Sequence, residues 1–216
     1  MHIDIWSDVV CPWCYLGKRR LERALEDFDH RADVTIAHRS FQLDPSRPKD
    51  QTSNRRQMLM KKYALTEDQV RLMDEKMERT AAADGLAYRL SPEGLTGNTL
   101  DAHRLLHFAK ARGREDAVLD RLYRAYFGEQ RSIFDVDSLV TLASEAGLDA
   151  DDTRHVLQSD AHVKDVAADL SEARMLGVSG VPFFVIDDRY AVSGAQPIDI
   201  FRQALRQAWA NRLIVS

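Results

Sequence analysis

The sequence predicts a mixed α/β fold in which the two ends of the chain build one domain around an inserted helical domain. Residues 1–45 alternate between strand and helix patterns, and strand patterns return only after residue 177. The stretch between them carries helical spacing almost throughout. We therefore place one domain at 1–45 and 177–216, and the insertion at 46–176.

The beginning of the chain has the pattern of a strand, a helix and a second strand. Apolar and polar residues alternate over 2–6 and again over 33–38, and apolar residues recur at helical spacing after Pro12. Pro12 suits the first turn of a helix, because a helix leaves its first N–H groups without internal partners. This part of the chain therefore predicts a βαβ unit.

The end of the chain predicts a hairpin followed by a helix. A short apolar strand at 182–186 and a second strand at 190–193 are separated by Asp187 and Asp188, which favour a turn. Helical spacing then covers 197–211. Joined to the βαβ unit, this ββα unit gives a thioredoxin-like fold that the insertion interrupts.

The insertion is expected to be all-helical. Thr66 and Gln69 have the spacing of a capping box at the start of one of its helices. An apolar stripe along that helix is expected from Val70, Met73, Met77 and Ala81. The helices predicted in this region span 66–83, 100–110, 117–127, 136–146 and 161–176.

Composition and charge exclude several classes of partner. The net charge is −4 and the basic residues are scattered, so a nucleic-acid-binding surface is not expected. No apolar run approaches the roughly 20 residues that cross a membrane. The first strand begins directly after Met1 and leaves no room for a secretory signal. We therefore expect a cytoplasmic protein without nucleic-acid or membrane partners.

The chain has two cysteines, Cys11 and Cys14, at the junction between the first strand and the first helix. A zinc site would need two further ligands at suitable spacing, so no metal site is expected. Thiol–disulfide exchange needs a thiolate that attacks and a second thiol that releases the mixed disulfide. Backbone N–H groups at a helix N-terminus favour an anion on Cys11. The spacing thus predicts an exposed nucleophile, Cys11, and an inward-facing resolving thiol, Cys14.

Two segments resemble the DsbA-like thioredoxin family. One is Cys-Pro-Trp-Cys-Tyr-Leu-Gly at 11–17, and the other is Gly-Val-Ser-Gly-Val-Pro-Phe-Phe-Val at 177–185. Within the family the chain looks closest to the cytoplasmic FrnE-type branch, which 98–105 and 193–197 also resemble. In two respects the chain departs from relatives: it lacks the second cysteine pair of some FrnE-type proteins, and the histidine beside the nucleophile of exported DsbA proteins.

The resemblance implies a helical domain over the active site and a cis peptide bond between Val181 and Pro182, lying against the cysteine pair. The Val181 backbone would then align an extended substrate, and Pro182 would shape the surroundings of the sulfur atoms. Pro12 and Trp13, between the cysteines, would tune the pair. No bound cofactor is implied, and glutathione is a candidate reductant.

These observations predict a thiol–disulfide oxidoreductase that acts on disulfide-containing proteins or small-molecule thiols. One alternative is a glutathione-dependent transferase or isomerase related to glutathione transferase kappa and 2-hydroxychromene-2-carboxylate isomerase, which use serine in place of the first cysteine. A second is a chaperone-like peptide-binding protein. Its apolar groove would draw on four methionines of the insertion, Met58, Met60, Met73 and Met77.

Overall fold

The computed structural model describes residues 1–212 and divides the chain into two compact units. One unit joins Met1–Leu43 to the chain from Asp169 onward, and the other is Asp44–Ala168. The first break lies close to the predicted boundary at 45. The second precedes the predicted boundary at 177, for a reason given below.

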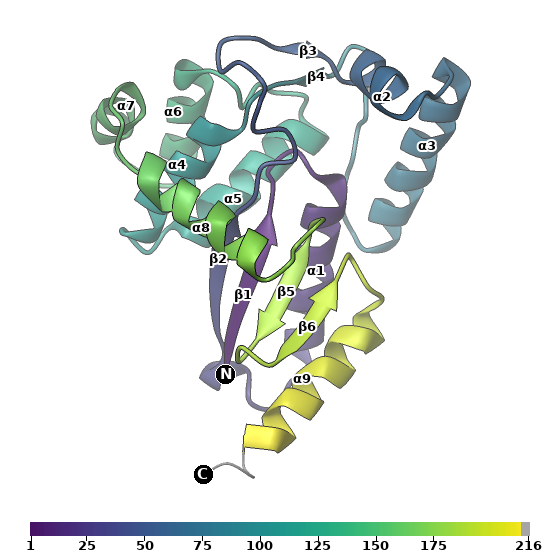
Figure 1. Cartoon of the computed structure of the whole chain (residues 1–216), viewed down its shortest axis with the longest axis vertical. Helices are drawn as coiled ribbons and strands as arrows, with labels where there is room; N and C mark the ends of the chain where they lie inside the picture. Colours follow the sequence, from purple (N-terminus) through teal and green to yellow (C-terminus); the bar gives the residue numbers. More distant parts are fainter. Residues whose placement is uncertain (213–216) are drawn as a thin grey trace. The chain divides into compact units, whose positions relative to one another are not determined.

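The first unit has the predicted thioredoxin-like order of elements (Figure 1). Its four-stranded sheet has the order β2-β1-β5-β6, with β1 parallel to β2 and antiparallel to β5. The hairpin turn has left-handed backbone at Asp187 and Asp188 (φ 48° and 55°), which matches the twist of the paired strands. The elements are β1 (His2–Ser7), α1 (Pro12–Glu26), β2 (Thr35–Ser40), β5 (Phe183–Ile186), β6 (Tyr190–Ser193) and α9 (Ile198–Arg212).

The alternation of β1 divides its side chains between two apolar clusters. Ile3 and Ile5 are buried on one face, in a cluster shared with α1 and α9 through residues such as Leu21 and Phe201. Trp6 lies on the opposite face, in a cluster with Ala173 and Val178. Burial on both faces fixes the register of β1, because a one-residue slip would exchange the two sets of side chains.

Asp169 explains why the second unit ends earlier than the sequence suggests. Its carboxylate accepts a hydrogen bond from the Ser40 backbone N–H (2.8 Å) and pairs with Arg39 (3.4 Å), and its carbonyl accepts one from the Trp6 indole (3.2 Å). Arg39 also donates to the carboxylate of Asp4 at 2.6 Å. These partners are far from Asp169 in sequence, so periodicity alone does not reveal them.

The second unit is helical, as predicted (Figure 1). Two short helices, α2 and α7, were not predicted, and α2 has no buried residue that would create an apolar pattern. A π-helical turn at Arg124–Gly128 follows α5, and the short strands β3 (Ser53–Asn54) and β4 (Leu95–Thr96) pair with each other. The helices are α2 (Arg55–Tyr63), α3 (Glu67–Ala83), α4 (Leu100–Lys110), α5 (Glu115–Tyr123), α6 (Val136–Glu145), α7 (Ala150–Gln158) and α8 (Val163–Met175), which continues past the break at 169.

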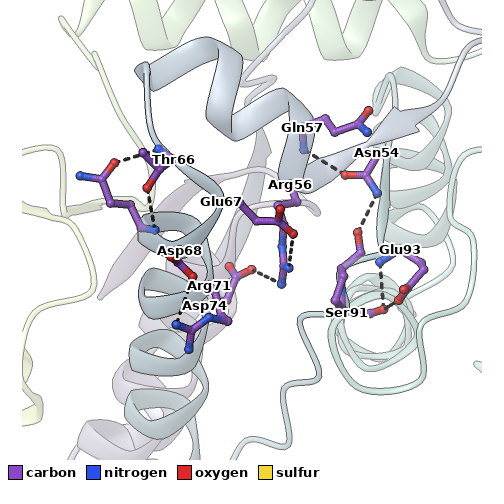
Figure 2. A network of polar contacts seen from close by, with 12 residues as sticks. Asn54, Arg56, Gln57, Thr66, Glu67, Asp68, Arg71, Asp74, Ser91 and Glu93 are labelled. Atoms are coloured by element: carbon purple, nitrogen blue, oxygen red, sulfur yellow. Dashed lines mark hydrogen bonds and ion pairs between the residues drawn. The ribbon is translucent and has the colours of Figure 1, made fainter.

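The start of α3 confirms one sequence prediction, and its buried face corrects another. Thr66 and Gln69 form both hydrogen bonds of a capping box, which Figure 2 shows at the top of the helix. Met73, however, is 40% exposed and does not belong to the buried stripe. Asp74 is buried instead, because its carboxylate accepts a hydrogen bond from Arg55 at 2.5 Å and lies 3.9 Å from Arg56.

Four charged side chains form a network that joins α5, the segment after it and the end of α6. Arg121 pairs with Glu145 at 2.5 Å and with Glu129 at 2.6 Å, and Arg131 pairs with Glu145 at 2.9 Å. Hydrogen bonds from Arg131 and Arg121 lower the pKa of Glu145 from 4.5 to about 2. A carboxyl whose pKa is lowered in the folded state stabilises that state above its unfolded pKa, and this contribution is lost as the pH falls.

We therefore expect Glu145→Gln to lower the free energy of unfolding at pH 7, and the difference from the parent to shrink as the pH falls from about 4.5 to about 2. Because Glu145 is 40% exposed, solvent screening limits the loss to about 1 kcal/mol or less. Urea unfolding at pH 7, 4 and 2 measures it, with Glu26→Gln on the exposed end of α1 as the control. A difference that stays constant with pH would contradict the assignment.

Candidate active site

The two cysteines lie at the N-terminus of α1. Cys11 is the N-cap residue, with extended backbone, and its N–H donates to the Asp8 carbonyl at 3.1 Å. The Cys14 N–H donates to the Cys11 carbonyl at 3.0 Å and closes the first turn. Both thiols are free, so the structure shows the reduced pair.

Both cysteines are buried, which corrects the expectation of an exposed Cys11. Cys11 is 4% exposed and Cys14 is 1% exposed. Burial raises the pKa of the Cys14 thiol well above its usual range, and a hydrogen bond with the Cys11 thiol raises it further. Cys14 therefore carries its proton at neutral pH.

Val181 covers the first thiol. The Cys11 Sγ–H donates to the Val181 carbonyl, with 3.6 Å between sulfur and oxygen. The peptide bond between Val181 and Pro182 is cis, and the Pro182 carbonyl accepts a hydrogen bond from the Gly194 N–H at 2.8 Å. The loop before β5 is thus held at the N-terminus of α1 from one side and at the end of β6 from the other.

The two residues between the cysteines are less enclosed. Pro12 is half-buried at the first position of α1, where its missing N–H removes one of the unpartnered donors of the helix end. Trp13 is 46% exposed, so nearly half of its surface is open to a bound molecule. The structure therefore groups Cys11, Cys14, Val181 and Pro182, while Trp13 stands at the surface beside them.

Gly17 is the last residue of the 11–17 motif, and the sequence alone gave it no role. A Cβ atom on Gly17 would lie 2.9 Å from Cγ of Pro182 and 3.1 Å from Cζ of Phe184. The absence of a side chain is what lets α1 approach β5 and the proline this closely. A glycine inside a helix destabilises it by about 0.5–1 kcal/mol relative to alanine. A glycine at position 17 was therefore the one sequence signal that another element packs closely against this helix.

Two charged residues near the cysteines are also buried. Lys18 is 4% exposed and donates a hydrogen bond to Glu22, so a carboxylate offsets its positive charge. Asp8 is 1% exposed and its carboxylate accepts a hydrogen bond from the Leu43 N–H at 2.8 Å. Burial and the contact with Cys11 raise the pKa of Cys14 most; a backbone hydrogen bond with Asp8 lowers it, and the negative charge of Asp8 raises it.

Comparison with known proteins identifies the family. The family model of the DSBA-like thioredoxin domain matches residues 2–206. The chain belongs to this family. Its structure is similar to that of a probable DsbA oxidoreductase from Streptomyces coelicolor, with 50% sequence identity and a TM-score of 0.94, over 97% of this chain and 90% of the other.

Two more distant solved structures share the fold alone. One is a 2-hydroxychromene-2-carboxylate isomerase, with 20% identity and a TM-score of 0.71 over the whole of both chains. The other is the cytosolic disulfide reductase DsbM from Pseudomonas aeruginosa, with 18% identity and a TM-score of 0.67 over the whole of both chains. DsbM has also been solved with glutathione. The fold is therefore common to enzymes with different chemistry.

We expect Gly17→Ala to destabilise the protein by about 1–3 kcal/mol, because the added methyl group overpacks the contact with Pro182 and Phe184. Urea unfolding measures the change. Gly180→Ala is the matched control: a Cβ atom there meets nothing within 4 Å, so its stability should stay the same or rise slightly. Equal stability of Gly17→Ala and the parent would show that the helix can move away without cost.

We expect Asp8→Asn to lower the pKa of Cys14, since the substitution removes a negative charge and keeps an oxygen for the Leu43 N–H. The pH dependence of Cys14 alkylation, followed by mass spectrometry, should move to lower pH. The exposed Asp29→Asn serves as the control and should leave the profile in place. An unchanged midpoint in Asp8→Asn would mean that solvent screens this charge.

Proposed function

We propose that this protein is a thiol–disulfide oxidoreductase in which Cys11 is the nucleophile and Cys14 the resolving thiol. The observation that carries the proposal is the pairing of two free thiols in one helical turn, with the sulfur of Cys11 against the Val181 carbonyl. Membership of the DSBA-like family supports it, as does the similarity to the probable oxidoreductase from S. coelicolor.

In the reducing direction, the Cys11 thiolate attacks one sulfur of a substrate disulfide. The substrate S–S bond breaks, one substrate thiol leaves with a proton, and a mixed disulfide joins Cys11 to the other. Cys14 then gives up its proton and attacks the sulfur of Cys11, which releases the second substrate thiol and leaves a Cys11–Cys14 disulfide. Two electrons pass to the substrate, and a thiol reductant such as glutathione restores the dithiol.

The difference between the two thiols supports this division of roles. Burial keeps the proton on Cys14, so the second thiol does not compete for the substrate disulfide in the first step. Cys14 becomes the attacking group once the mixed disulfide has formed next to it. The Val181 backbone aligns an extended substrate, Pro182 shapes the surroundings of the reacting sulfurs, and Pro12 and Trp13 adjust the pair and its contact with substrate.

We further propose that the protein works in the cytoplasm and acts as a reductase or isomerase. A reducing compartment favours this direction, because glutathione keeps thiols reduced there. DsbM, a cytosolic disulfide reductase solved with glutathione, shares the fold and supports glutathione as the reductant. In the described part of the chain, no helix is both long enough and apolar enough to span a bilayer.

The rival activities receive less support. The isomerase shares the fold, so the fold alone does not separate the two activities. Two thiols in contact favour disulfide chemistry, because an enzyme that only binds glutathione has no need of Cys14. No observation singles out a peptide-binding groove: Met77 is buried, Met58 and Met60 are half-buried, and Met73 is 40% exposed.

We expect Cys11→Ser to reduce disulfide-reductase turnover to the background rate, and Cys14→Ser to accumulate a mixed disulfide of Cys11 with the substrate. Insulin reduction and mass spectrometry after acid quenching measure these two results. Exposed Ser171→Ala serves as the control. Full turnover in Cys11→Ser would refute the mechanism. Glutathione-dependent isomerisation that survives Cys14→Ser, with no disulfide turnover in the parent, would favour the rival activity.

A further inference from the structure

The helical unit contains a pocket with no role in the proposed disulfide chemistry. Its volume is about 360 Å³, within the range of small-molecule sites. Its walls come from the start of α2, the segment 89–95 and the segment 126–134, and so lie entirely within the second unit. The pocket is thus a feature of the insertion itself.

Aromatic rings form the apolar wall. Tyr126 and Phe134 meet edge to face, with 5.6 Å between ring centres, and the Tyr126 hydroxyl donates to the Leu95 carbonyl at 2.8 Å. Gly97 permits this arrangement, because a Cβ atom there would lie 2.8 Å from the ring of Phe134. The wall is therefore fixed by packing and by a hydrogen bond, and offers a firm surface to a flat apolar group.

The backbone beneath this wall is unusual at two points. Tyr126 and Phe127 belong to the π-helical turn, a form that is rare and often occurs at functional sites. Gln130 has φ of 57°, a left-handed conformation that residues other than glycine seldom adopt. Both features lie within the segment that lines the pocket.

Most charged side chains of the lining are already balanced by partners. Three arginines line the pocket against one glutamate, Glu93. Arg55 is neutralised by Asp74, and Arg131 by Glu145. Glu93 is held by the Ser91 hydroxyl at 2.6 Å (Figure 2), and this hydrogen bond lowers its pKa, so it remains a carboxylate.

Arg89 differs from the other two arginines. Its backbone N–H donates to the Phe127 carbonyl at 2.6 Å, which anchors it next to the π-helical turn. Among residues 1–212, no hydrogen bond or ion pair occupies its guanidinium group. A guanidinium has paired donors that match the two oxygens of one carboxylate. One unoccupied guanidinium beside an aromatic wall therefore fits a single carboxylate on a flat apolar body.

We propose that this pocket binds a small organic monocarboxylate with a planar apolar body, held by Arg89 and packed on Tyr126 and Phe134. A free phosphate fits less well, since it has no apolar body for the aromatic wall and a larger charge to place near Glu93. The site extends the function of the protein beyond the cysteine pair, and its occupancy does not require Cys11.

Isothermal titration of the whole chain tests the proposal, with benzoate as the probe. Benzoate should bind, while benzamide, which has the same shape without the charge, and inorganic phosphate should each bind about tenfold more weakly or worse. Arg89→Gln should weaken the binding of benzoate by about tenfold or more, and Phe134→Leu should weaken this binding too. Arg79→Gln, an exposed arginine on α3 outside the pocket, is the matched control and should bind as the parent does.

Each other outcome overturns the proposal. The proposal would be refuted if the parent did not bind benzoate, or if Arg89→Gln bound it as tightly as the parent does. If phosphate bound as tightly as benzoate, the pocket would be a general anion site and not a site for an organic carboxylate. Thermal melting of Arg89→Gln establishes that the variant is folded, and Cys11→Ser should bind benzoate unchanged, so failure of the disulfide chemistry would not affect this test.

Discussion

The candidate active site depends on the close contact between α1 and the proline that precedes β5. Because Gly17 has no side chain, Pro182 and the ring of Phe184 occupy the space where a Cβ atom would lie. This contact sets the separation between the helix that carries both cysteines and the strand end that carries Val181. The hydrogen bond from Cys11 to the Val181 carbonyl follows from that separation.

The two thiols have different surroundings. Both are removed from water, but Cys14 lies one turn into the helix, where burial holds its proton, with Asp8 nearby. Cys11 lies at the helix end, with a carbonyl as its neighbour. A pair three residues apart thus becomes two chemically distinct groups through packing rather than through residue type.

Much of the first unit could be predicted from the sequence, because its strands alternate and its first helix begins at Pro12. The second boundary of the insertion could not, since Asp169 is held by Ser40 and Arg39 across a long sequence separation. The helix α2 was missed because none of its residues is buried. Motif and resemblance predicted Cys11, Cys14, Val181 and Pro182 as the candidate site, and the structure brings Cys11 and Val181 into contact. The role of Gly17 became clear only from the structure, because the sequence pattern does not reveal which element packs against a helix.

The hydrogen bond between Cys11 and Val181 has a consequence for selectivity. In the proposed mechanism, the Val181 carbonyl that aligns an extended substrate is the one that accepts the thiol hydrogen of Cys11 in the free protein. A thiol is a weak donor, so a backbone N–H from an incoming strand is the stronger partner for that oxygen. In that mechanism, docking of the strand would release the Cys11 thiol to turn toward the disulfide that it cleaves. Small oxidants have no backbone N–H with which to displace the hydrogen bond between Cys11 and Val181. Under the proposed mechanism, the protein would therefore select substrates by their extended backbone rather than by their oxidising strength.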